Sequence, residues 1–204
     1  MIKFFYGMSG SFKGVTMTAE DIASDGCIKK VRSMIKVWKD LEGRIFLDTK
    51  PEDHRNFALL HLSLLQNMMD EVRLHRDPEI KFYPADINIE RGVSDPFYYY
   101  LRGKIYGRDT EEIIERAVDE EMRIVDYFGD IKKILLVNKD REFIKNVVLL
   151  EPHRSQVFPG GVDDYLRQQD DYISFTARYN KITEVREIDN AKDYIEGLGL
   201  KYLY

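Results

Sequence analysis

The first residues able to do chemistry lie in a glycine-rich stretch near the start of the chain. This stretch, GMSGSFKG at residues 7–14, follows an apolar run at residues 2–6. Gly7 and Lys13 have the separation of the phosphate-binding pattern G-x-x-x-x-G-K-[ST], although Phe12 replaces its second glycine and Gly14 its hydroxyl residue. In such a loop, backbone N–H groups and a helix N-terminus bind phosphate oxygens. The alternative interpretation is a plain strand-to-helix turn with an incidental lysine.

A second group of candidate residues lies in the sequence INIERGVSDPFYYY, at residues 87–100. Glu90 ends a predicted strand, and Arg91 and Gly92 follow it. A carboxylate at the carboxyl end of a parallel strand lies where ligands bind in α/β sheets, and it can hold the water shell of Mg²⁺. Arg91 is suited to a phosphate group or an acceptor. A surface Glu–Arg pair entering a turn is the alternative.

The elements that must position these residues alternate along the chain. Apolar runs and alternating patterns predict strands at residues 2–6, 44–48, 82–90, 131–137 and 181–188. Helical periodicity or start signals predict helices from Thr18 and over residues 28–41, 51–75, 109–128, most of 138–180 and 190–200, with an aromatic-rich helix after a turn near 94–101. This alternation predicts an α/β fold with a parallel sheet and helices on both faces, in a single domain spanning residues 1–204.

Composition restricts the class of protein. The 204 residues carry a net charge of −5, which disfavours extensive contact with a nucleic-acid backbone. The longest apolar runs are far shorter than the roughly 20 residues of a membrane span, and a secretory leader is not expected. The single cysteine fits a reducing compartment, so we expect a cytoplasmic protein.

With these surroundings, the stretch GMSGSFKGVT resembles the loop of the P-loop kinase superfamily. It is similar to the pattern G-x-x-G-x-G-K-x-T of the deoxynucleoside, nucleoside-monophosphate and nicotinamide-riboside kinase-like group, with Gly7, Gly10, Lys13 and Thr16 at matching positions. Glu90-Arg91-Gly92 with Asp95 resembles the D/E-R-S or D/E-R-G element of the same group. The resemblance implies a three-layer sandwich of P-loop NTPase type, with about five parallel strands and a helical lid at about residues 138–180.

The resemblance also implies roles for individual residues. In catalysis it implicates Lys13, Asp48, Glu90, Arg91, Arg154 and Arg167, with Arg141 as a further lid arginine. The nucleotide would contact Gly7, Gly10, Ser11, Phe12, Lys13, Gly14, Val15, Thr16, Asp189 and Ala191. The acceptor would contact Asp48, Gln66, Arg91 and Asp95, and Mg²⁺ would be held by Glu90 and by the hydroxyl of Thr16 or Ser11.

Two of these roles have ordinary alternatives. Asp48 is implied to be the general base that takes a proton from the acceptor hydroxyl, but it also suits a helix cap. Gln66 is implied to read a base, but it also suits a polar position at the edge of a core.

These residues favour an ATP- and Mg²⁺-dependent kinase that phosphorylates a nucleoside, a nucleotide or a related acceptor. One alternative is a kinase acting on a hydroxymethyl-pyrimidine in DNA, which the negative charge disfavours. Another is a P-loop NTPase or a degenerate nucleotide-binding module that acts through partners, which Phe12 and Gly14 favour. A dinucleotide-binding loop fits poorly, because the G-x-G spacing is absent. The resemblance also suggests a homodimer, and the short apolar runs predict no membrane partner.

Overall fold

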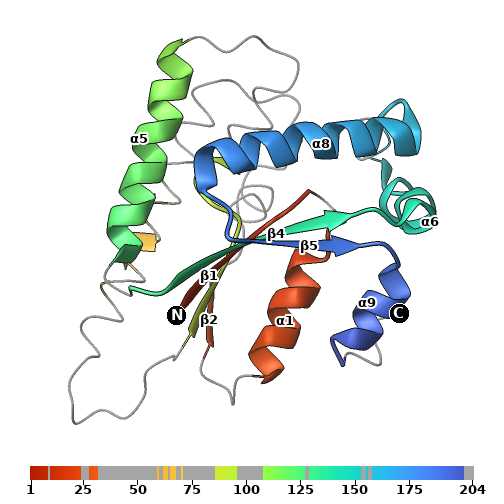
Figure 1. Ribbon diagram of the computed structural model, residues 1–204, viewed down its shortest axis with the longest axis horizontal. Coiled ribbons are helices and arrows are strands. Elements are labelled where there is room, and N and C mark those ends of the chain that lie inside the picture. Colours follow the sequence, from red (N-terminus) through yellow and green to blue (C-terminus); the bar gives the residue numbers. More distant parts are fainter. Residues whose placement is uncertain are drawn as a thin grey trace.

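A parallel sheet forms the centre of the molecule (Figure 1). The computed structural model describes residues 1–8, 10–23, 28–31, 59, 62–63, 65–67, 70, 86–95, 108–126, 129–152, 155 and 158–199. The strands are β1 (Ile2–Tyr6), β2 (Ile28–Val31), β3 (Asp86–Glu90), β4 (Ile131–Asn138) and β5 (Glu184–Ile188). They form a five-stranded sheet in the order β2-β3-β1-β4-β5, and all four neighbouring pairs are parallel. The predicted α/β class and parallel sheet are therefore confirmed.

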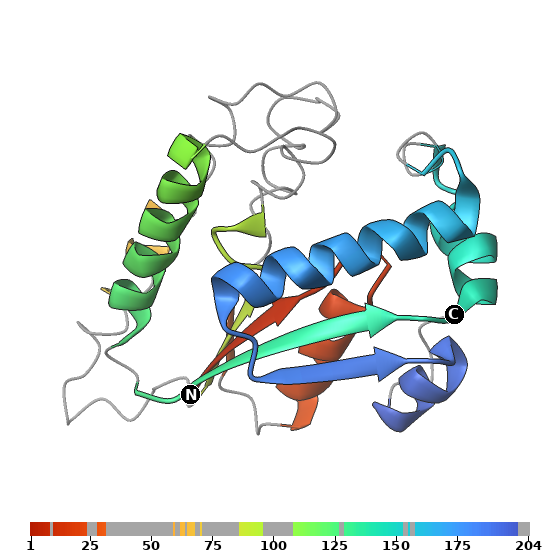
Figure 2. The same ribbon diagram turned by 45° about the horizontal axis from the view of Figure 1, so that its top comes forward.

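Helices cover both faces of the sheet, as Figures 1 and 2 show. On one face lie α5 (Arg108–Val125) and α8 (Gly161–Asn180), and on the other lie α1 (Lys13–Ala23) and α9 (Ala191–Gly197). A short helix α6 (Arg141–Phe143) continues into a π-helix, η3 (Ile144–Val148), after β4. The predicted three-layer arrangement follows from this placement.

Alternation along β1 divides the core into two clusters. Phe4 and Tyr6 belong to the cluster between the sheet and helices α5 and α8, whereas Phe5 belongs to the cluster on the side of α1 and α9. All three side chains are completely buried. Successive strand residues point to opposite faces, so a central strand covered on both faces is apolar throughout.

The strand order brings the two predicted motifs to one edge of the sheet. The chain leaves β1 for β2, returns through β3 and then crosses over β1 to reach β4. Phe5 of β1 is in register with Glu90 of β3 and Ile134 of β4. The loop after β1 and the turn after Glu90 therefore lie side by side at the carboxyl ends of the strands, where α/β sheets bind ligands.

Residues 28–41, predicted as a helix, begin with a strand instead. Ile28–Val31 forms β2 and pairs with β3, with Ile28 opposite Asp86 and Val31 opposite Ile89. Apolar residues three apart suit a helix, but a four-residue segment with two β-branched residues carries little information on its period. The sheet edge offered by β3 decides the outcome, because it provides backbone hydrogen-bonding partners. Residues 32–41 and the strand predicted at 44–48 lie outside the described residues.

Several boundaries also differ from prediction. Helix α1 begins at Lys13 rather than at Thr18. Glu20 therefore lies in the helix interior, where it pairs with Lys3 and Arg186. β5 begins at Glu184 because Lys181, with φ of 48°, ends α8 in the left-handed conformation. The strand predicted at 131–137 and the helix predicted at 109–128 are confirmed as β4 and α5 within a few residues. Among the described segments, no helix has the length and apolar composition of a membrane span.

Candidate active site

The loop between β1 and α1 is shaped by two glycines with positive φ. Gly7 has φ of 149° and Gly10 has φ of 84°. A Cβ atom on Gly7 would lie 2.2 Å from the Ser11 Oγ, and one on Gly10 would lie 2.5 Å from Val148 of η3. Both positions therefore require glycine for conformation and for space. Val148, in the segment predicted as a lid, thus packs directly against this loop.

Lys13, the first residue of α1, is folded back over this loop. Its Nζ donates hydrogen bonds to the carbonyl oxygens of Gly7, at 2.6 Å, and Met8, at 2.8 Å, and to the Ser11 Oγ, at 3.3 Å. The side chain is 6% exposed. A buried ammonium group with its donors on loop oxygens holds positive charge at the mouth of the loop, next to the N-terminus of α1. This arrangement favours an anion such as a phosphate group.

Phe12, which replaces the second glycine of the usual pattern, has a left-handed backbone with φ of 61°. Its ring packs against Phe143 of α6, with centroids 4.6 Å apart, and against Tyr194 of α9, at 5.9 Å. The side chain is 7% exposed. The phenylalanine therefore keeps the backbone conformation of a glycine while adding aromatic contacts to α6 and to α9.

A cavity of about 510 Å³ opens in front of this loop. The loop and the start of α1 contribute most of its lining, and Glu90 and Arg91 after β3 contribute the rest together with Phe143. Its lining residues are Gly10, Ser11, Phe12, Lys13, Gly14, Val15, Thr18, Glu90, Arg91 and Phe143. The two motifs that the sequence predicts as phosphate-binding loop and magnesium- or acceptor-binding turn thus face one cavity.

The turn after Glu90 is held in an uncommon conformation. Arg91 has φ of 68°, and its backbone N–H donates to the carbonyl oxygen of Phe5 in β1 at 2.9 Å. The Oε2 of Glu121, from α5, accepts a hydrogen bond from the Val93 N–H at 2.7 Å. A Cβ atom on Gly92 would lie 2.7 Å from the Tyr6 hydroxyl. Because Gly92 has no Cβ atom, the backbone of the turn can pack closely against the side chains of Tyr6 and Glu121.

Asp95 lies beneath this turn rather than in the cavity. Its carboxylate is completely buried, and it accepts hydrogen bonds from the Arg91 Nη1, at 3.1 Å, and from the Tyr172 hydroxyl, at 2.9 Å. Burial raises the pKa of Asp95, whereas the charges of Arg91 and Lys13 and the hydrogen bonds from Tyr172 and Arg91 act in the opposite direction. Burial and the nearby carboxylates of Glu121 and Asp95 raise the pKa of Tyr6 well above its ordinary value, so this phenol stays protonated.

Asn138, the last residue of β4, also holds the loop in place. The Nδ2 of Asn138 donates to the carbonyl oxygen of Gly10 at 2.9 Å. Gln169 of α8 holds Asn138 by accepting from its backbone N–H, at 3.0 Å, and donating to its carbonyl oxygen, at 2.8 Å. Asn138 and Gln169 are both buried, so these bonds are shielded from water.

Asp140 connects the start of α6 to the first residue of α9. Its Oδ1 caps α6 by accepting from the Phe143 N–H at 2.9 Å, and its Oδ2 accepts from the Ala191 N–H at 2.7 Å. The backbone N–H of Ala191 is therefore bonded to protein, and its side chain is buried. Asp189, the other residue implied to border adenine, is exposed.

Other residues implied by the resemblance lie elsewhere. Thr16 is completely buried one turn into α1, and its hydroxyl donates to the Phe12 carbonyl oxygen, at 2.9 Å, and shares a hydrogen bond with Tyr194, at 2.8 Å. Arg167 pairs with Asp164 at 2.5 Å beside a second cavity at the start of α8. Gln66 donates to Asp70 at 2.8 Å. Asp48 and Arg154 lie outside the described residues.

The donor set of the cavity fits Mg²⁺ bound together with a nucleotide. Glu90 and Ser11 line the cavity, whereas Gly14 occupies the position after the lysine that usually provides a hydroxyl ligand. The described residues contain no group of three or more His, Cys, Asp or Glu side chains placed to hold a metal. One carboxylate with phosphate oxygens and water is the usual protein environment of Mg²⁺. Glu90 and Ser11, which both line the cavity, fit that environment, and Thr16 does not line the cavity.

The sequence did not indicate the residues whose hydrogen bonds support the loop and the turn from the protein interior. These residues are Tyr172, Asn138, Gln169, Asp140 and Glu121. They are polar residues within segments that look solvent-exposed because of their charge. Their partners lie far away in the chain; the Tyr172 hydroxyl and the Gly7 N–H, for example, are 165 residues apart. A weak signal exists in Gln169 and Tyr172, which lie three residues apart and thus on one face of a helix.

Comparison with solved structures identifies the fold. A comparison with family models finds no match, and a comparison with curated proteins finds none either. Deoxyadenosine kinase from M. mycoides, solved with products dCMP and dCDP, is similar with a TM-score of 0.50 and 13% identity over 98% of each chain. Thymidylate kinase from Ehrlichia chaffeensis has a TM-score of 0.46 and 13% identity, over 98% of this chain and 95% of its own. The chain has the P-loop kinase-like fold of the M. mycoides deoxyadenosine kinase.

Proposed function

We propose that this protein is a kinase that transfers the γ-phosphoryl group of ATP to a nucleoside, a nucleotide or a related acceptor. One observation carries the proposal: Lys13 and the Glu90–Arg91 turn line the same cavity at the carboxyl ends of β1 and β3. A nucleotide-hydrolysing switch needs the loop and its lysine. The additional buried arginine, Arg91, in the same cavity favours transfer to a second substrate.

Each cavity residue then has a role that its chemistry supports. Lys13 and the first backbone N–H groups of α1 bind the β- and γ-phosphates. Glu90, with Ser11, holds Mg²⁺, which supplies charge neutralisation between the phosphates. Arg91 binds the acceptor or the transferred group, because its planar fork matches phosphate oxygens. Catalysis rests on positioning and charge, since phosphoryl transfer leaves the protein little covalent chemistry.

The remaining assignments are part of the same proposal. Asp48 orients the acceptor hydroxyl, Gln66 contacts the acceptor, and Asp189 lies beside the base. Arg154 and Arg167 act as lid arginines, which for Arg167 requires leaving Asp164, its partner in this structure. The segment at 138–180 then works as a lid that closes over the phosphates.

The test is transfer of label from γ-labelled ATP in the presence of Mg²⁺. The acceptors are nucleosides, nucleoside monophosphates, nicotinamide riboside, and plain or hydroxymethylated DNA. Label on one acceptor establishes the kinase and its substrate class, including the DNA alternative. Label released only as free phosphate contradicts transfer and indicates an NTPase.

Lys13→Met is the matched control for this assay, because it retains the aliphatic stem and removes the charge. It should abolish transfer while circular dichroism remains unchanged. Full transfer by Lys13→Met would remove the loop from the mechanism. Absence of transfer, of hydrolysis and of any ATP-dependent change in melting temperature would contradict nucleotide binding itself.

A further inference from the structure

A buried chain of hydrogen bonds joins the two motifs behind the cavity. The N–H of Gly7, the first residue of the loop, donates to the Tyr172 hydroxyl at 3.1 Å, and its carbonyl oxygen accepts from Lys13 at 2.6 Å. The Tyr172 hydroxyl donates in turn to Asp95, lying 2.9 Å from Oδ1 and 3.1 Å from Oδ2. Asp95 accepts from Arg91 at 3.1 Å. One hydroxyl thus connects the loop that holds Lys13 to the carboxylate that holds Arg91.

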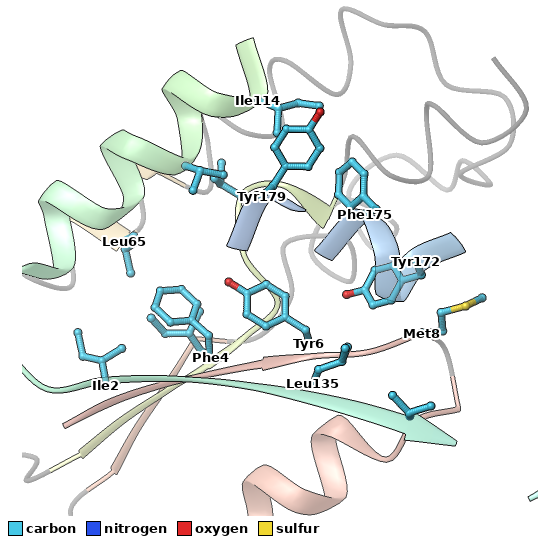
Figure 3. Close-up of a cluster of buried hydrophobic side chains, with 14 of the residues drawn as sticks. Ile2, Phe4, Tyr6, Met8, Leu65, Ile114, Leu135, Tyr172, Phe175 and Tyr179 are labelled. Carbon is cyan, nitrogen blue, oxygen red and sulfur yellow. The ribbon is translucent and has the colours of Figure 1, made fainter. Parts of the chain in front are cut away.

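The position of Tyr172 excludes direct contact with a substrate. Its side chain is completely buried, as is Asp95. Figure 3 shows Tyr172 above the strand that carries Tyr6 and close to Met8, at the point where β1 becomes the loop. The two residues that do face the cavity, Lys13 and Arg91, lie at the two ends of the chain of bonds.

We propose that Tyr172 is a positioning residue that couples the phosphate-binding loop to Arg91, so that occupancy of one half of the site affects the other. This inference rests on the proposed function. A phosphate or acceptor group that engages Arg91 draws its guanidinium away from Asp95. The Asp95 carboxylate then accepts a stronger hydrogen bond from the Tyr172 hydroxyl. This alters the strength of the hydrogen bond that the Tyr172 oxygen accepts from the Gly7 N–H. Because the Gly7 carbonyl oxygen also holds Lys13, the change reaches the group that binds the triphosphate.

Helix α8 provides a matched control for this role. Tyr179 lies on the same helix and is 7% exposed, but its buried hydroxyl has no hydrogen-bonding partner in the described structure. Tyr172→Phe and Tyr179→Phe therefore each remove one buried phenolic oxygen, and only the first breaks the chain of bonds. A general effect of removing a tyrosine hydroxyl from the core appears in both variants.

The first measurement follows the Gly7 amide by ¹H–¹⁵N NMR on the ligand-free protein. Asp95→Asn, or Arg91→Lys where Asp95→Asn does not fold, should shift the Gly7 resonance in the wild-type background and in Tyr179→Phe. The same substitution should shift it much less in Tyr172→Phe. An equal shift with and without the hydroxyl overturns the coupling, whether or not the protein is a kinase.

The second measurement is MgATP affinity by calorimetry, with unfolding by urea on the same samples. Tyr172→Phe should weaken MgATP binding about tenfold, the effect of leaving one buried donor without its acceptor. Tyr179→Phe should stay within about twofold of wild type. A Tyr172→Phe variant that loses stability but binds MgATP as well as wild type has only a structural defect, which overturns the inference. A wild-type chain that binds no MgATP overturns the proposed function, while the NMR result still decides the coupling between Gly7 and Arg91.

Discussion

Phe12 offers the sharpest test of how this loop differs from the usual phosphate-binding pattern. Replacing it by alanine removes a ring that is 7% exposed and packed between Phe143 and Tyr194. Truncating a buried phenylalanine costs about 3–5 kcal/mol of unfolding free energy. In a chain of this size, about 4 kcal/mol corresponds to a fall in Tm of roughly 8–16 °C.

Replacing Phe12 by glycine removes the same ring but also relieves the left-handed backbone at φ of 61°. Relief of that conformation is worth about 1–2 kcal/mol, and the greater freedom of glycine in the unfolded chain removes about 0.4–1 kcal/mol of the gain. Phe12→Gly should therefore be more stable than Phe12→Ala by about 0.5–1 kcal/mol. This order is the reverse of the usual effect of glycine in or next to a helix.

Urea unfolding of wild type and of both variants, at one pH and temperature, measures these differences. MgATP affinity, measured alongside, should fall in both variants because the loop loses its aromatic contact with Phe143 of α6. A Phe12→Ala variant more stable than Phe12→Gly would show that residue 12 is not held in the left-handed region. A Phe12→Gly variant with stronger ATP binding or faster transfer would refute the view that the aromatic contact serves the site.

Three further predictions concern the surroundings of the loop. Gly14→Ala and Gly14→Ser should each stabilise the protein by about 0.5 kcal/mol, because a Cβ atom there meets nothing within 4 Å; only Gly14→Ser should lower the Mg²⁺ concentration required for transfer. Asp140→Ala should cost about 1–2 kcal/mol in urea unfolding, because the Phe143 and Ala191 N–H groups lose their acceptor, whereas Asp140→Asn should cost less. Burial acts to raise the pKa of Glu20, but the hydrogen bonds and charges of Lys3 and Arg186 outweigh it and lower the pKa. The ionised form is therefore favoured on folding, and Glu20→Gln should lose about 1 kcal/mol at pH 7, a loss that disappears as the pH falls through the lowered pKa of Glu20.

The parts of the candidate site whose positions in the fold the sequence predicted are those with a local pattern. Gly7 and Lys13 are six residues apart in a loop that must follow an apolar strand, and Glu90 ends another apolar strand. Predicting the position of each residue requires only the sequence of its own segment and the rule that the carboxyl ends of parallel strands meet at one edge of the sheet. The structure brings both to one cavity because β3 lies next to β1.

The parts that the sequence did not predict depend on contacts between distant segments. Nothing within residues 28–31 decides between strand and helix; the free edge of β3 does. In α8, the run Tyr165 to Tyr172 looks hydrophilic, yet Gln168 and Gln169 are buried. Burying an amide is unfavourable without hydrogen-bonding partners. The partner that makes Gln169 acceptable is the backbone of Asn138, which no local pattern reveals.

Gly92 shows how a local pattern and a distant contact are combined in this site. The resemblance admits serine or glycine after the arginine, and the sequence alone gives no reason for the choice. The structure provides one, since a Cβ atom at residue 92 would lie 2.7 Å from the Tyr6 hydroxyl and 3.1 Å from the Glu121 Oε1. Tyr6 ends β1 immediately before the loop, and Glu121 holds the turn through the Val93 N–H. Gly92, in the Glu90–Arg91 motif, is therefore required by Tyr6, the residue that precedes the phosphate-type loop. The two motifs thus contact each other through the core, in addition to lining one cavity.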